Sequence, residues 1–493
     1  MPPCIWALLG SLGENKYPAI CEEAGEVREV EIVIVGGGPA GLGAALEASA
    51  AGAEVLLVDE YHTLGGQYYK QAPGAFGIRD PRAEGRQYAE GADLIRRLAA
   101  SPVEVMLDTL LYGIFDERTL ALCRGERTEE IRAKALILAP GAQEMPVAFP
   151  GWTLPGVMMG GGAQALVGSQ RILPGYRAVM AGVGPLQMKV AAQLAGAGVE
   201  VVEVLEASPT SPMSVGHGLR AFGHWGKMRE GLEYWLTLKR AGVPIRPRHV
   251  PVRALGTEGL EAVVVARLDE DWRVIPGSER TVPADLLCLS YGFLPSTQLP
   301  RLAGSRSVFD AEAGSWVTWH DENQETDRKG IYVAGEVGGI GGADVAESEG
   351  RLAAIAAARA AGKPHPGGRR PEEQAIRARL AKARRFARVA RGMLRVEPAL
   401  FDLITDDTIV CRCERVTARE VKAAIADGDP TLRGVKGRTR AGMGRCQGRI
   451  CGHLVSRLIA KQTGVPMAQI LPDTPRVPVK PVPLGALAAE AAP

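Results

Sequence analysis

Residues 31–41 read Glu-Ile-Val-Ile-Val-Gly-Gly-Gly-Pro-Ala-Gly. The first five are predicted to form a short buried strand, and an alanine-rich helix is expected from about Pro39 to Ala51. The apolar run Val55–Val58 gives a second buried strand, which ends at Asp59 and Glu60. A strand, a glycine turn, a helix and a second strand in this order predict a βαβ unit.

The glycines of this unit have the spacing that a dinucleotide phosphate requires. Gly36-x-Gly38-x-x-Gly41 follows the strand and opens the helix with Pro39 and Ala40. The first glycine allows the tight turn, the second lets the backbone approach a pyrophosphate, and the third permits close packing of helix on strand. The free N–H groups at the start of the helix favour an anion. Asp59 is placed to bind a ribose hydroxyl.

A second copy of the pattern starts near residue 178. A strand over 178–181 leads into the turn Gly182-Val-Gly184-Pro185, a helix runs to about residue 195, and a strand follows over 199–205. Gln187 stands where a third glycine is expected, and Glu206 ends the second strand. The pattern leaves three alternatives at Gly182 and Gly184: NAD(P), another nucleotide, or a structural remnant without a ligand.

Four of the eight cysteines gather near the C-terminus. They form the pattern Cys411-x-Cys413 and, 32 residues later, Cys446-x₄-Cys451. Four thiolates suit either a [2Fe–2S] cluster or zinc. Because zinc ribbons favour CxxC pairs, this spacing favours iron–sulfur, with zinc and unligated thiols as the alternatives. Nearby arginines would offset the negative charge of the cluster.

Composition excludes several classes of protein. A length of 493 residues suggests about three domains, and the 46% apolar and 23% charged content is that of a globular protein. The net charge of +2 predicts no nucleic-acid partner. The longest uncharged run, 145–170, is broken by prolines and glycines, so no integral membrane segment is expected. Clustered thiols without a signal peptide predict a reducing, cytoplasmic compartment.

Further motifs resemble the glutathione-reductase-like flavoproteins. Gly65-Gly66-Gln67 follows Asp59 and Glu60, and a late strand ends at Gly335-Glu336, where that superfamily usually has Gly-Asp. Ala139-Pro140-Gly141 stands where Ala-Thr-Gly is usual. The resemblance implies an α/β fold with two Rossmann-like dinucleotide-binding domains and a small, mainly helical C-terminal [2Fe–2S] domain. The residues implied to bind FAD or another adenine nucleotide such as ATP are Gly36, Gly38, Pro39, Ala40, Gly41, Asp59, Glu60, Gly65, Gly66, Gln67, Gly141, Gly335 and Glu336.

The expected segments follow from these motifs and from the composition. Residues 369–395 hold ten Lys or Arg and two acids, with apolar residues at helical spacing, so a basic amphipathic linker helix is expected there. The division is an N-terminal extension (1–28), a discontinuous FAD- or nucleotide-binding domain (29–150 with 290–362), a second dinucleotide-binding domain (151–289), the linker helix (363–404), a [2Fe–2S] domain (405–470) and a Pro/Ala-rich tail (471–493), expected to be extended or disordered.

A closer resemblance rests on residues 149–157, 182–187 and 440–449. They read FPGWTLPGV, GVGPLQ and RAGMGRCQGR, and are similar to the alpha subunits of opine oxidases, hydrogen cyanide synthase and dye-linked proline or hydroxyproline dehydrogenases. The resemblance covers roughly residues 29–470. Its C-terminal part resembles the bacterioferritin-associated-ferredoxin-like [2Fe–2S] domain, with Cys411, Cys413, Cys446 and Cys451 as ligands.

The resemblance implies that the chain is one part of a larger assembly. A beta subunit similar to D-amino-acid and sarcosine oxidases would oxidise an amino acid or secondary amine on its own FAD. Electrons would pass through FMN at the subunit interface in some members and through this chain's cluster to a quinone or respiratory carrier. Further implications are a small third subunit, and attachment to the inner face of the membrane. Two alternatives remain: a stand-alone NAD(P)H-dependent reductase and a non-catalytic nucleotide-bound scaffold.

Overall fold

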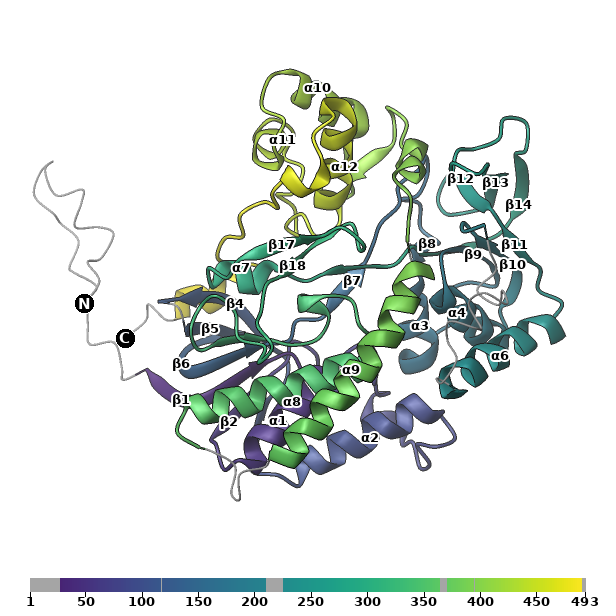
Figure 1. The fold of residues 1–493 in the computed structure, drawn as a ribbon. Helices are drawn as coiled ribbons and strands as arrows, with labels where there is room; N and C mark the ends of the chain where they lie inside the picture. Colours follow the sequence, from purple (N-terminus) through teal and green to yellow (C-terminus); the bar gives the residue numbers. More distant parts are fainter. Residues whose placement is uncertain (1–26, 117, 210–224, 364–369, 394, 490–493) are drawn as a thin grey trace, which may run out of the picture.

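The structure is a computed structural model that describes residues 27–116, 118–209, 225–363, 370–393 and 395–489. Figure 1 shows two α/β halves with a small helical unit at one end. The expected N-terminal extension lies almost wholly outside the described residues.

The first half is built around a seven-stranded sheet. The order β3-β2-β1-β6-β5-β4 runs across it, with β19 also paired to β6. The glycine turn follows β1, and α1 (Pro39–Ala50) leaves it to pack beside α8 (Ala343–Ala360). The strands are β1 (Arg28–Val35), β2 (Val55–Val58), β3 (Glu104–Met106), β4 (Thr109–Phe115), β5 (Thr119–Arg124), β6 (Arg127–Leu138) and β19 (Ile331–Val333).

Strand β1 forms parallel pairs on both sides, with Val35 opposite Val58 of β2 and Leu138 of β6. The apolar run that predicted this strand is therefore buried on both faces, as parallel sheets require. Since β1, β2 and β6 end at the same edge, the turns after them meet there. These turns carry the first glycine motif, Asp59 and Gly141.

The second half holds a parallel five-stranded sheet in the order β11-β10-β9-β15-β8. A three-stranded antiparallel sheet, β12-β13-β14, lies in the same half. The bounds are β8 (Val157–Met159), α3 (Gly160–Ala165), β9 (Arg177–Gly182), α4 (Pro185–Gly196), β10 (Glu200–Glu206), α6 (Trp225–Arg240), β11 (Ile245–Pro247), β12 (His249–Leu255), β13 (Ala262–Arg267), β14 (Arg280–Pro283) and β15 (Leu286–Ser290). The second glycine motif follows β9, so the predicted repeat of the βαβ pattern is present.

Short strands connect the halves. Strand β7 (Ala142–Glu144) pairs with β16 (Phe293–Pro295), so the two crossings between the halves lie side by side. Other elements of the nucleotide-binding halves are α2 (Arg86–Ala99), α7 (Gln298–Leu302), β17 (Ser307–Asp310) and β18 (Ser315–Thr318).

The basic linker helix is α9 (Arg370–Met393). Ile376 and Leu380 are buried against α8, as the amphipathic pattern predicted. Some of its arginines pair with acids of other elements: Arg384 binds Glu349 of α8 at 2.8 Å, and Arg391 binds Asp310 of β17 at 3.4 Å. The basic face of α9 therefore binds the first half through ion pairs.

The C-terminal unit contains three helices and a two-stranded sheet, seen at the top of Figure 1. Its elements are β20 (Ile409–Cys411), β21 (Val416–Thr417), α10 (Ala418–Ala426), α11 (Leu432–Thr439) and α12 (Cys451–Thr463). The tail beyond it was expected to be extended or disordered, but it packs against the first half and contains a helix: Val479 donates to the carbonyl of Tyr112 at 2.9 Å, and α13 (Leu484–Ala489) lies against β6. We call residues 470–489 the strap.

One hydrophobic core joins the C-terminal unit to the second half. Phe149 and Trp152 belong to the same buried cluster as Val410 and Leu454. The Trp152 side chain is 1% exposed, and its Nε1 donates to the carbonyl of Ile409 at 2.7 Å. The two parts therefore share packing rather than a thin surface contact.

Replacing Trp152 with alanine should lower the free energy of unfolding by about 3–5 kcal/mol, because it leaves a large cavity in this shared core. Denaturant unfolding measures the change. The matched variant Trp152→Phe keeps most of the packing and loses the hydrogen bond, so a loss of only about 1–2 kcal/mol is expected. Equal stability of W152A and the unchanged chain would contradict the shared core.

Candidate functional site

The first glycine turn has almost no room for side chains. Gly36 has φ +105°, and a Cβ on it would lie 2.3 Å from the carbonyl oxygen of Ala139. A Cβ on Gly41 would lie 1.8 Å from the carbonyl oxygen of Gly36. Gly38 differs from both, since its φ is −76° and its nearest neighbour would be Gly66 Cα at 3.7 Å. The close packing of the turn therefore requires glycine at positions 36 and 41. Glycine at position 38 instead leaves the surface of the turn free of a side chain.

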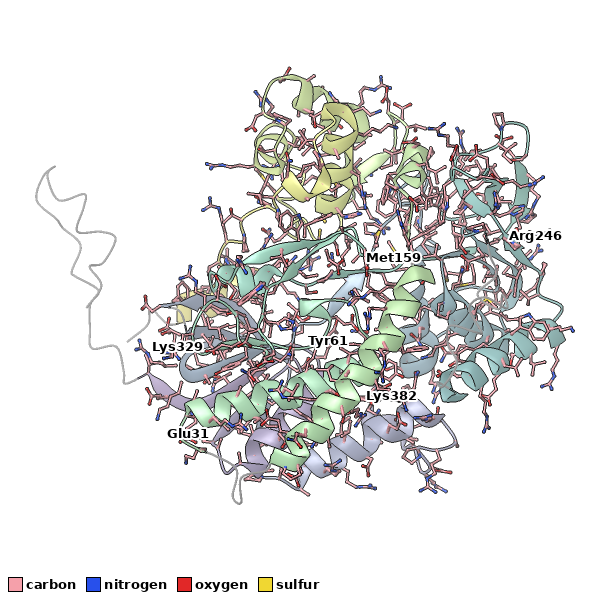
Figure 2. The ribbon with its side chains drawn as sticks, viewed as in Figure 1. Glu31, Tyr61, Met159, Arg246, Lys329 and Lys382 are labelled. Carbon is pink, nitrogen blue, oxygen red and sulfur yellow. The ribbon has the colours of Figure 1, made fainter. Side chains whose placement is uncertain are left out.

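Asp59 orders this turn through backbone N–H groups. Its Oδ2 accepts from Gly37 at 2.5 Å and its Oδ1 from Tyr61 at 2.8 Å. The carboxyl is buried, and desolvation raises its pKa, while those two hydrogen bonds act in the opposite direction. Figure 2 labels Tyr61 in the first half and Arg246 in the second.

A cavity of about 1720 Å³ opens at the edge of the first sheet and extends to the second half. Gly41 and Gly65 are not among its lining residues, and act instead in the turn packing. Most of the predicted nucleotide residues do line it: Gly36, Gly38, Pro39, Ala40, Asp59, Glu60, Gly66, Gln67, Gly141, Gly335 and Glu336.

This cavity fits a bound dinucleotide. Its volume exceeds that of an ordinary drug-sized pocket, and it follows the start of α1, where no side chain caps the helix. The uncapped start of the helix offers N–H groups to a phosphate. The residues of the first half are therefore suited to hold a flavin or another adenine nucleotide.

The second glycine turn is arranged differently. Glu206 is fully buried, and its Oε2 accepts from the backbone N–H of Gly184 at 3.1 Å and from Gln187 Nε2 at 2.7 Å. Gly184 is the N-cap of α4, so this hydrogen bond ties the acid to the glycine turn, as Asp59 is tied to Gly37 in the first turn. Neither Gly182 nor Gly184 is among the described residues that line the large cavity.

Glu336 also lies at the start of a helix. Its carboxylate accepts from the backbone of Gly342 at 2.8 Å and of Gly341 at 3.2 Å, just before α8. Burial raises the pKa of Glu336 to about 7, although the two N–H groups favour its charged form. The glutamate thus reaches the cavity wall.

The four clustered cysteines meet in the C-terminal unit. The Cys451 thiol interacts with those of Cys411 and Cys446, and Cys446 also interacts with Cys413. Within the described ranges, no group of three or more His, Cys, Asp or Glu side chains is arranged to hold one metal ion. In a [2Fe–2S] cluster, each of the two irons takes two of the four thiolates. This arrangement is consistent with the chain of thiol contacts from Cys411 through Cys451 and Cys446 to Cys413.

Two of the four clustered cysteines favour the thiolate form. Hydrogen bonding to Cys451 lowers the pKa of Cys411 to about 6 and that of Cys446 to about 5, and backbone N–H groups assist. The same contacts raise the pKa of Cys451, and the pKa of Cys413 is also raised. Gly444 leaves the space that Cys413 needs, because a Cβ there would lie 2.2 Å from Cys413 Cβ. The donor set therefore fits a [2Fe–2S] cluster, as the spacing predicted.

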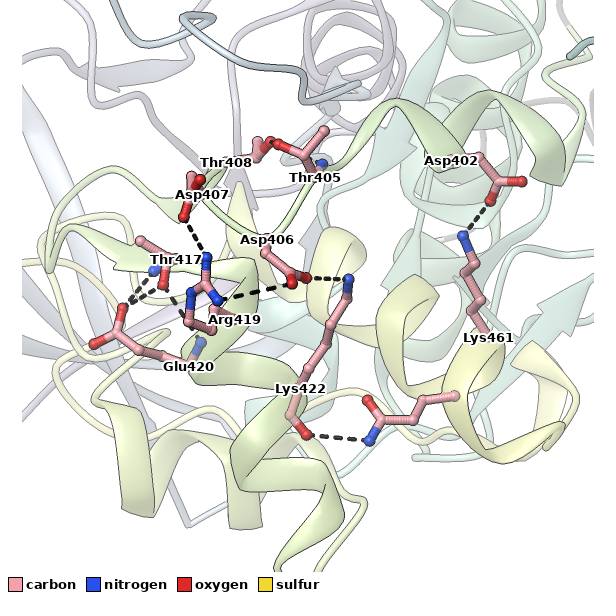
Figure 3. A network of polar contacts seen from close by, with 11 residues as sticks. Asp402, Thr405, Asp406, Asp407, Thr408, Thr417, Arg419, Glu420, Lys422 and Lys461 are labelled. Atoms are coloured by element: carbon pink, nitrogen blue, oxygen red, sulfur yellow. Dashed lines mark hydrogen bonds and ion pairs between the residues drawn. The ribbon is translucent and has the colours of Figure 1, made fainter. Parts of the chain in front are cut away.

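A polar network braces the outer side of this unit, as Figure 3 shows. Thr417 and Glu420 form a capping box at the start of α10. Lys422 binds Asp406 at 2.7 Å, and Lys461 of α12 binds Asp402 at 2.6 Å. These contacts tie the segment before Cys411 to the helices that carry and support the other cysteines.

Several residues at the cavity had no distinguishing signal in the sequence. Glu144 follows the Gly141 turn, Arg449 stands between two cysteines, and Lys480 lies in the tail, yet all three line the large cavity. Lys480 forms an ion pair with Glu60. Contacts between positions hundreds of residues apart gave no periodic pattern that could have predicted them.

Glu144 is a half-buried acid, one of whose carboxyl oxygens is buried without a hydrogen-bond partner. Its Oε2 accepts from Gly161 at 2.8 Å, and its Oε1 has no hydrogen-bond partner. Burial raises the pKa of Glu144 to about 7 from an ordinary value of 4.5. Between pH 4.5 and pH 7, the folded chain therefore keeps a proton on Glu144 that the unfolded chain has released. Because the folded state binds more protons in this range, the free energy of unfolding falls as the pH rises from about 4.5 to 7.

Replacing Glu144 with glutamine should remove this fall. The stability of E144Q relative to the unchanged chain should rise by up to about 3 kcal/mol between pH 4.5 and pH 8. Thermal or denaturant unfolding across that range measures it. Glu312, which is exposed, provides the control Glu312→Gln, for which a flat difference is expected. A flat difference for E144Q as well would contradict the buried position of the acid.

Comparison with known proteins gives the family. A family model described as "Pyridine nucleotide-disulphide oxidoreductase" matches residues 30–362, and one described as "BFD-like [2Fe-2S] binding domain" matches residues 409–461. The HcnB subunit of hydrogen cyanide synthase from Pseudomonas aeruginosa is 34% identical over 463 residues, which are 92% of this chain and 97% of that one. The A subunit of opine oxidase from Rhizobium meliloti is 34% identical over 470 residues, 93% of this chain and 98% of that one.

The chain belongs to the opine oxidase A/HcnB family. It is an oxidoreductase subunit with a dinucleotide-binding flavoprotein part and a [2Fe–2S]-binding part, as the sequence motifs predicted. The crystal structure of L-proline dehydrogenase from P. horikoshii shares the fold, with a TM-score of 0.67, 22% identity, and coverage of 95% of this chain and 81% of that one. The predicted α/β fold with a small C-terminal domain is confirmed.

This member of the opine oxidase A/HcnB family has no cysteine pair for disulfide chemistry in its described nucleotide-binding halves. Cys123 lies in β5 and Cys288 in β15, in different sheets, and both are buried and free. None of the helices in the part of the chain that the structure describes has the length and apolar character that a membrane crossing needs.

Proposed function

We propose that this chain is the electron-transferring alpha subunit of a heteromeric dehydrogenase or oxidase that acts on an amino acid or secondary amine. The substrate would be oxidised on a separate subunit similar to D-amino-acid or sarcosine oxidases. In this chain, electrons would pass between a flavin and the [2Fe–2S] cluster on their way to an external acceptor. The relatives named as opine oxidase and hydrogen cyanide synthase subunits support this assignment.

The observation that carries the proposal is a shared wall between the two cofactor sites. Gln143 of β7 and Arg449 of the cysteine loop both line the large cavity, and the Gln143 side chain donates to the Arg449 carbonyl. The same two residues also line a smaller cavity of about 170 Å³ beside Cys451. A nucleotide bound in the first half would therefore lie next to the loop that holds the cluster.

The chain's own residues would then act as ligands. Gly38 and the start of α1 would bind a phosphate, Asp59 would bind a ribose hydroxyl, and the four clustered cysteines would hold iron. A flavin exchanges electrons in pairs or singly and a [2Fe–2S] cluster exchanges one at a time, so together they would link a two-electron oxidation to a one-electron acceptor. No side chain of this chain needs to act as a base on the amine.

The finer assignments belong to the same proposal. We assign FAD to the first nucleotide site, with ATP as the alternative adenine nucleotide, and place an FMN at the interface with the partner. A quinone or respiratory carrier would accept the electrons, and a small third subunit would complete the assembly. We also place the complex in the cytoplasm, at most peripheral to the inner face of the membrane, because clustered thiolates with bound iron need a reducing compartment.

Co-expression with an FAD-dependent amino-acid oxidase-like protein, encoded by a gene next to the gene for this chain, tests the proposal. The purified complex should reduce a dye with one member of a panel of opines, proline, hydroxyproline and glycine, and neither of the two proteins should do so on its own. The complex should contain two irons and two acid-labile sulfides per copy of this chain. The proposal would be contradicted if the copurified complex contained both cofactors but failed to reduce the dye with any amino acid or amine tested.

A second assay distinguishes a stand-alone NAD(P)H reductase. Because the proposal takes electrons from a partner subunit, anaerobic NAD(P)H should leave the flavin absorbance of the isolated chain unchanged on the timescale of turnover. Fast bleaching would favour the reductase. A chain with neither iron nor a bleachable visible spectrum would favour a scaffold.

A further inference from the structure

Arg449 occupies the boundary between the two cofactor sites. It lies in the loop between Cys446 and Cys451, where its side chain is partly buried. It lines both the large nucleotide cavity and the smaller cavity beside the cysteine loop. Of the arginines near the cysteines, Arg445 is the useful contrast, because it is exposed and lines neither cavity.

Three segments that are distant in sequence meet at Arg449. Its Nη1 donates to the carbonyl oxygen of Cys446 at 3.2 Å, and its Nη2 donates to the carbonyl oxygen of Val479 in the strap at 3.2 Å. Its own carbonyl accepts from the Gln143 side chain in β7. The planar fork of the guanidinium therefore holds the cysteine loop and the strap at the same time, which a single ammonium group cannot do in the same geometry.

The strap continues from this contact to the ribose end of the nucleotide site. Val479 pairs with Tyr112 of β4, and the next residue, Lys480, forms its ion pair with Glu60. The guanidinium of Arg449 also interacts electrostatically with the carboxylate of Glu60 and the thiol of Cys446. One positive charge is thus shared between an acid of the nucleotide site and a cysteine of the cluster site.

We propose that Arg449 is a positioning residue that couples the nucleotide site to the iron–sulfur loop. Its fork fixes the Cys446–Cys451 loop and the strap against the cavity wall, and its charge stabilises the reduced cluster. The inference rests on the proposed function, since it assigns a role to a residue between the two cofactors. It separates into two effects, because the charge and the fork can be removed independently.

Three variants of the full chain, purified with its cofactors, test the charge effect. Arg449→Met removes charge and fork, Arg449→Lys keeps the charge, and Arg445→Met removes an exposed charge beside the same cysteine. A potentiometric titration followed by the EPR signal of the reduced cluster is the measurement. At the potential that half-reduces the unchanged cluster, R449M should show a reduced-to-oxidised ratio about tenfold lower, which is about 59 mV for one electron. R449K should stay near the unchanged ratio, and R445M should change it less than about threefold, because water screens an exposed charge.

Limited trypsin digestion tests the fork. Cleavage after Arg476 of the strap should be faster in both R449M and R449K, and unchanged in R445M. This readout does not depend on the cluster, and R449K supplies it even if R449M fails to fold.

The inference is overturned if R449M keeps both the potential and the cleavage rate of the unchanged chain, or if R449K is cleaved no faster. An equal shift in R445M and R449M would also overturn it, because the effect would then belong to net charge near the loop. Absence of iron from the chain would instead contradict the proposed function, and the digestion would still decide whether Arg449 tethers the strap.

Discussion

Replacing Cys446 with alanine is expected to abolish the iron–sulfur centre. The variant should fall from two irons per chain toward none, lose its visible iron–sulfur absorbance, and lower dye reduction by the assembled complex by more than about 100-fold. Cys446 is the thiol whose pKa falls lowest, to about 5, through its contact with Cys451 and nearby backbone N–H groups. Its removal takes away a thiolate that is already favoured at neutral pH.

Cys123→Ala is the matched control for this variant. Cys123 is also a free cysteine, but it is buried in β5 of the first half, away from the loop. It should keep its iron, its spectrum and the dye reduction. Iron retained at full occupancy in C446A would contradict the assignment of the cluster ligands, as would equal iron loss in C123A.

Replacing Gly38 with alanine is expected to weaken nucleotide binding by about 100-fold, which corresponds to about 2.7 kcal/mol. The φ of −76° suits alanine, and the new Cβ would have only ordinary contact with Gly66 Cα at 3.7 Å. The fold should therefore be unaffected. The added methyl group would instead occupy the surface on which a pyrophosphate must approach the backbone.

Flavin content of the purified protein and a titration with added FAD measure this effect. Gly437→Ala is the control, because Gly437 lies on α11, where a Cβ meets nothing within 4 Å and no cavity residue is changed. Both variants should have a free energy of unfolding close to that of the unchanged chain. A G38A protein that binds FAD normally would mean that the nucleotide lies elsewhere.

Local patterns made much of this fold predictable. The run 31–41 gave a strand, a turn and a helix because a parallel strand buried on both faces must be apolar, and because only glycine fits where a Cβ would lie 2.3 Å from the Ala139 carbonyl. The cysteine spacing likewise predicted a metal-binding loop. Both signals are short in sequence, so they survive without knowledge of distant contacts.

The second glycine turn shows where such patterns stop. Gly182-x-Gly184 and Glu206 look like a nucleotide site, but the glutamate is one methylene longer than Asp59. It bonds the N-cap N–H of Gly184, whereas Asp59 bonds Gly37, one residue earlier in its turn. Motif spacing alone could not predict which backbone N–H of its turn each acid binds.

The sequence by itself determined the two βαβ turns, the basic amphipathic helix and the four thiols, because each depends on residues within one or two elements. Only the tertiary structure decided that strand β7, the cysteine loop and the strap meet around Arg449, and that the Oε1 atom of Glu144 is buried without a hydrogen-bond partner. Those features depend on contacts between residues such as Gln143, Arg449 and Val479. Burial and charge at such a junction depend on how whole domains pack, and the spacing of apolar residues along the sequence cannot predict that packing.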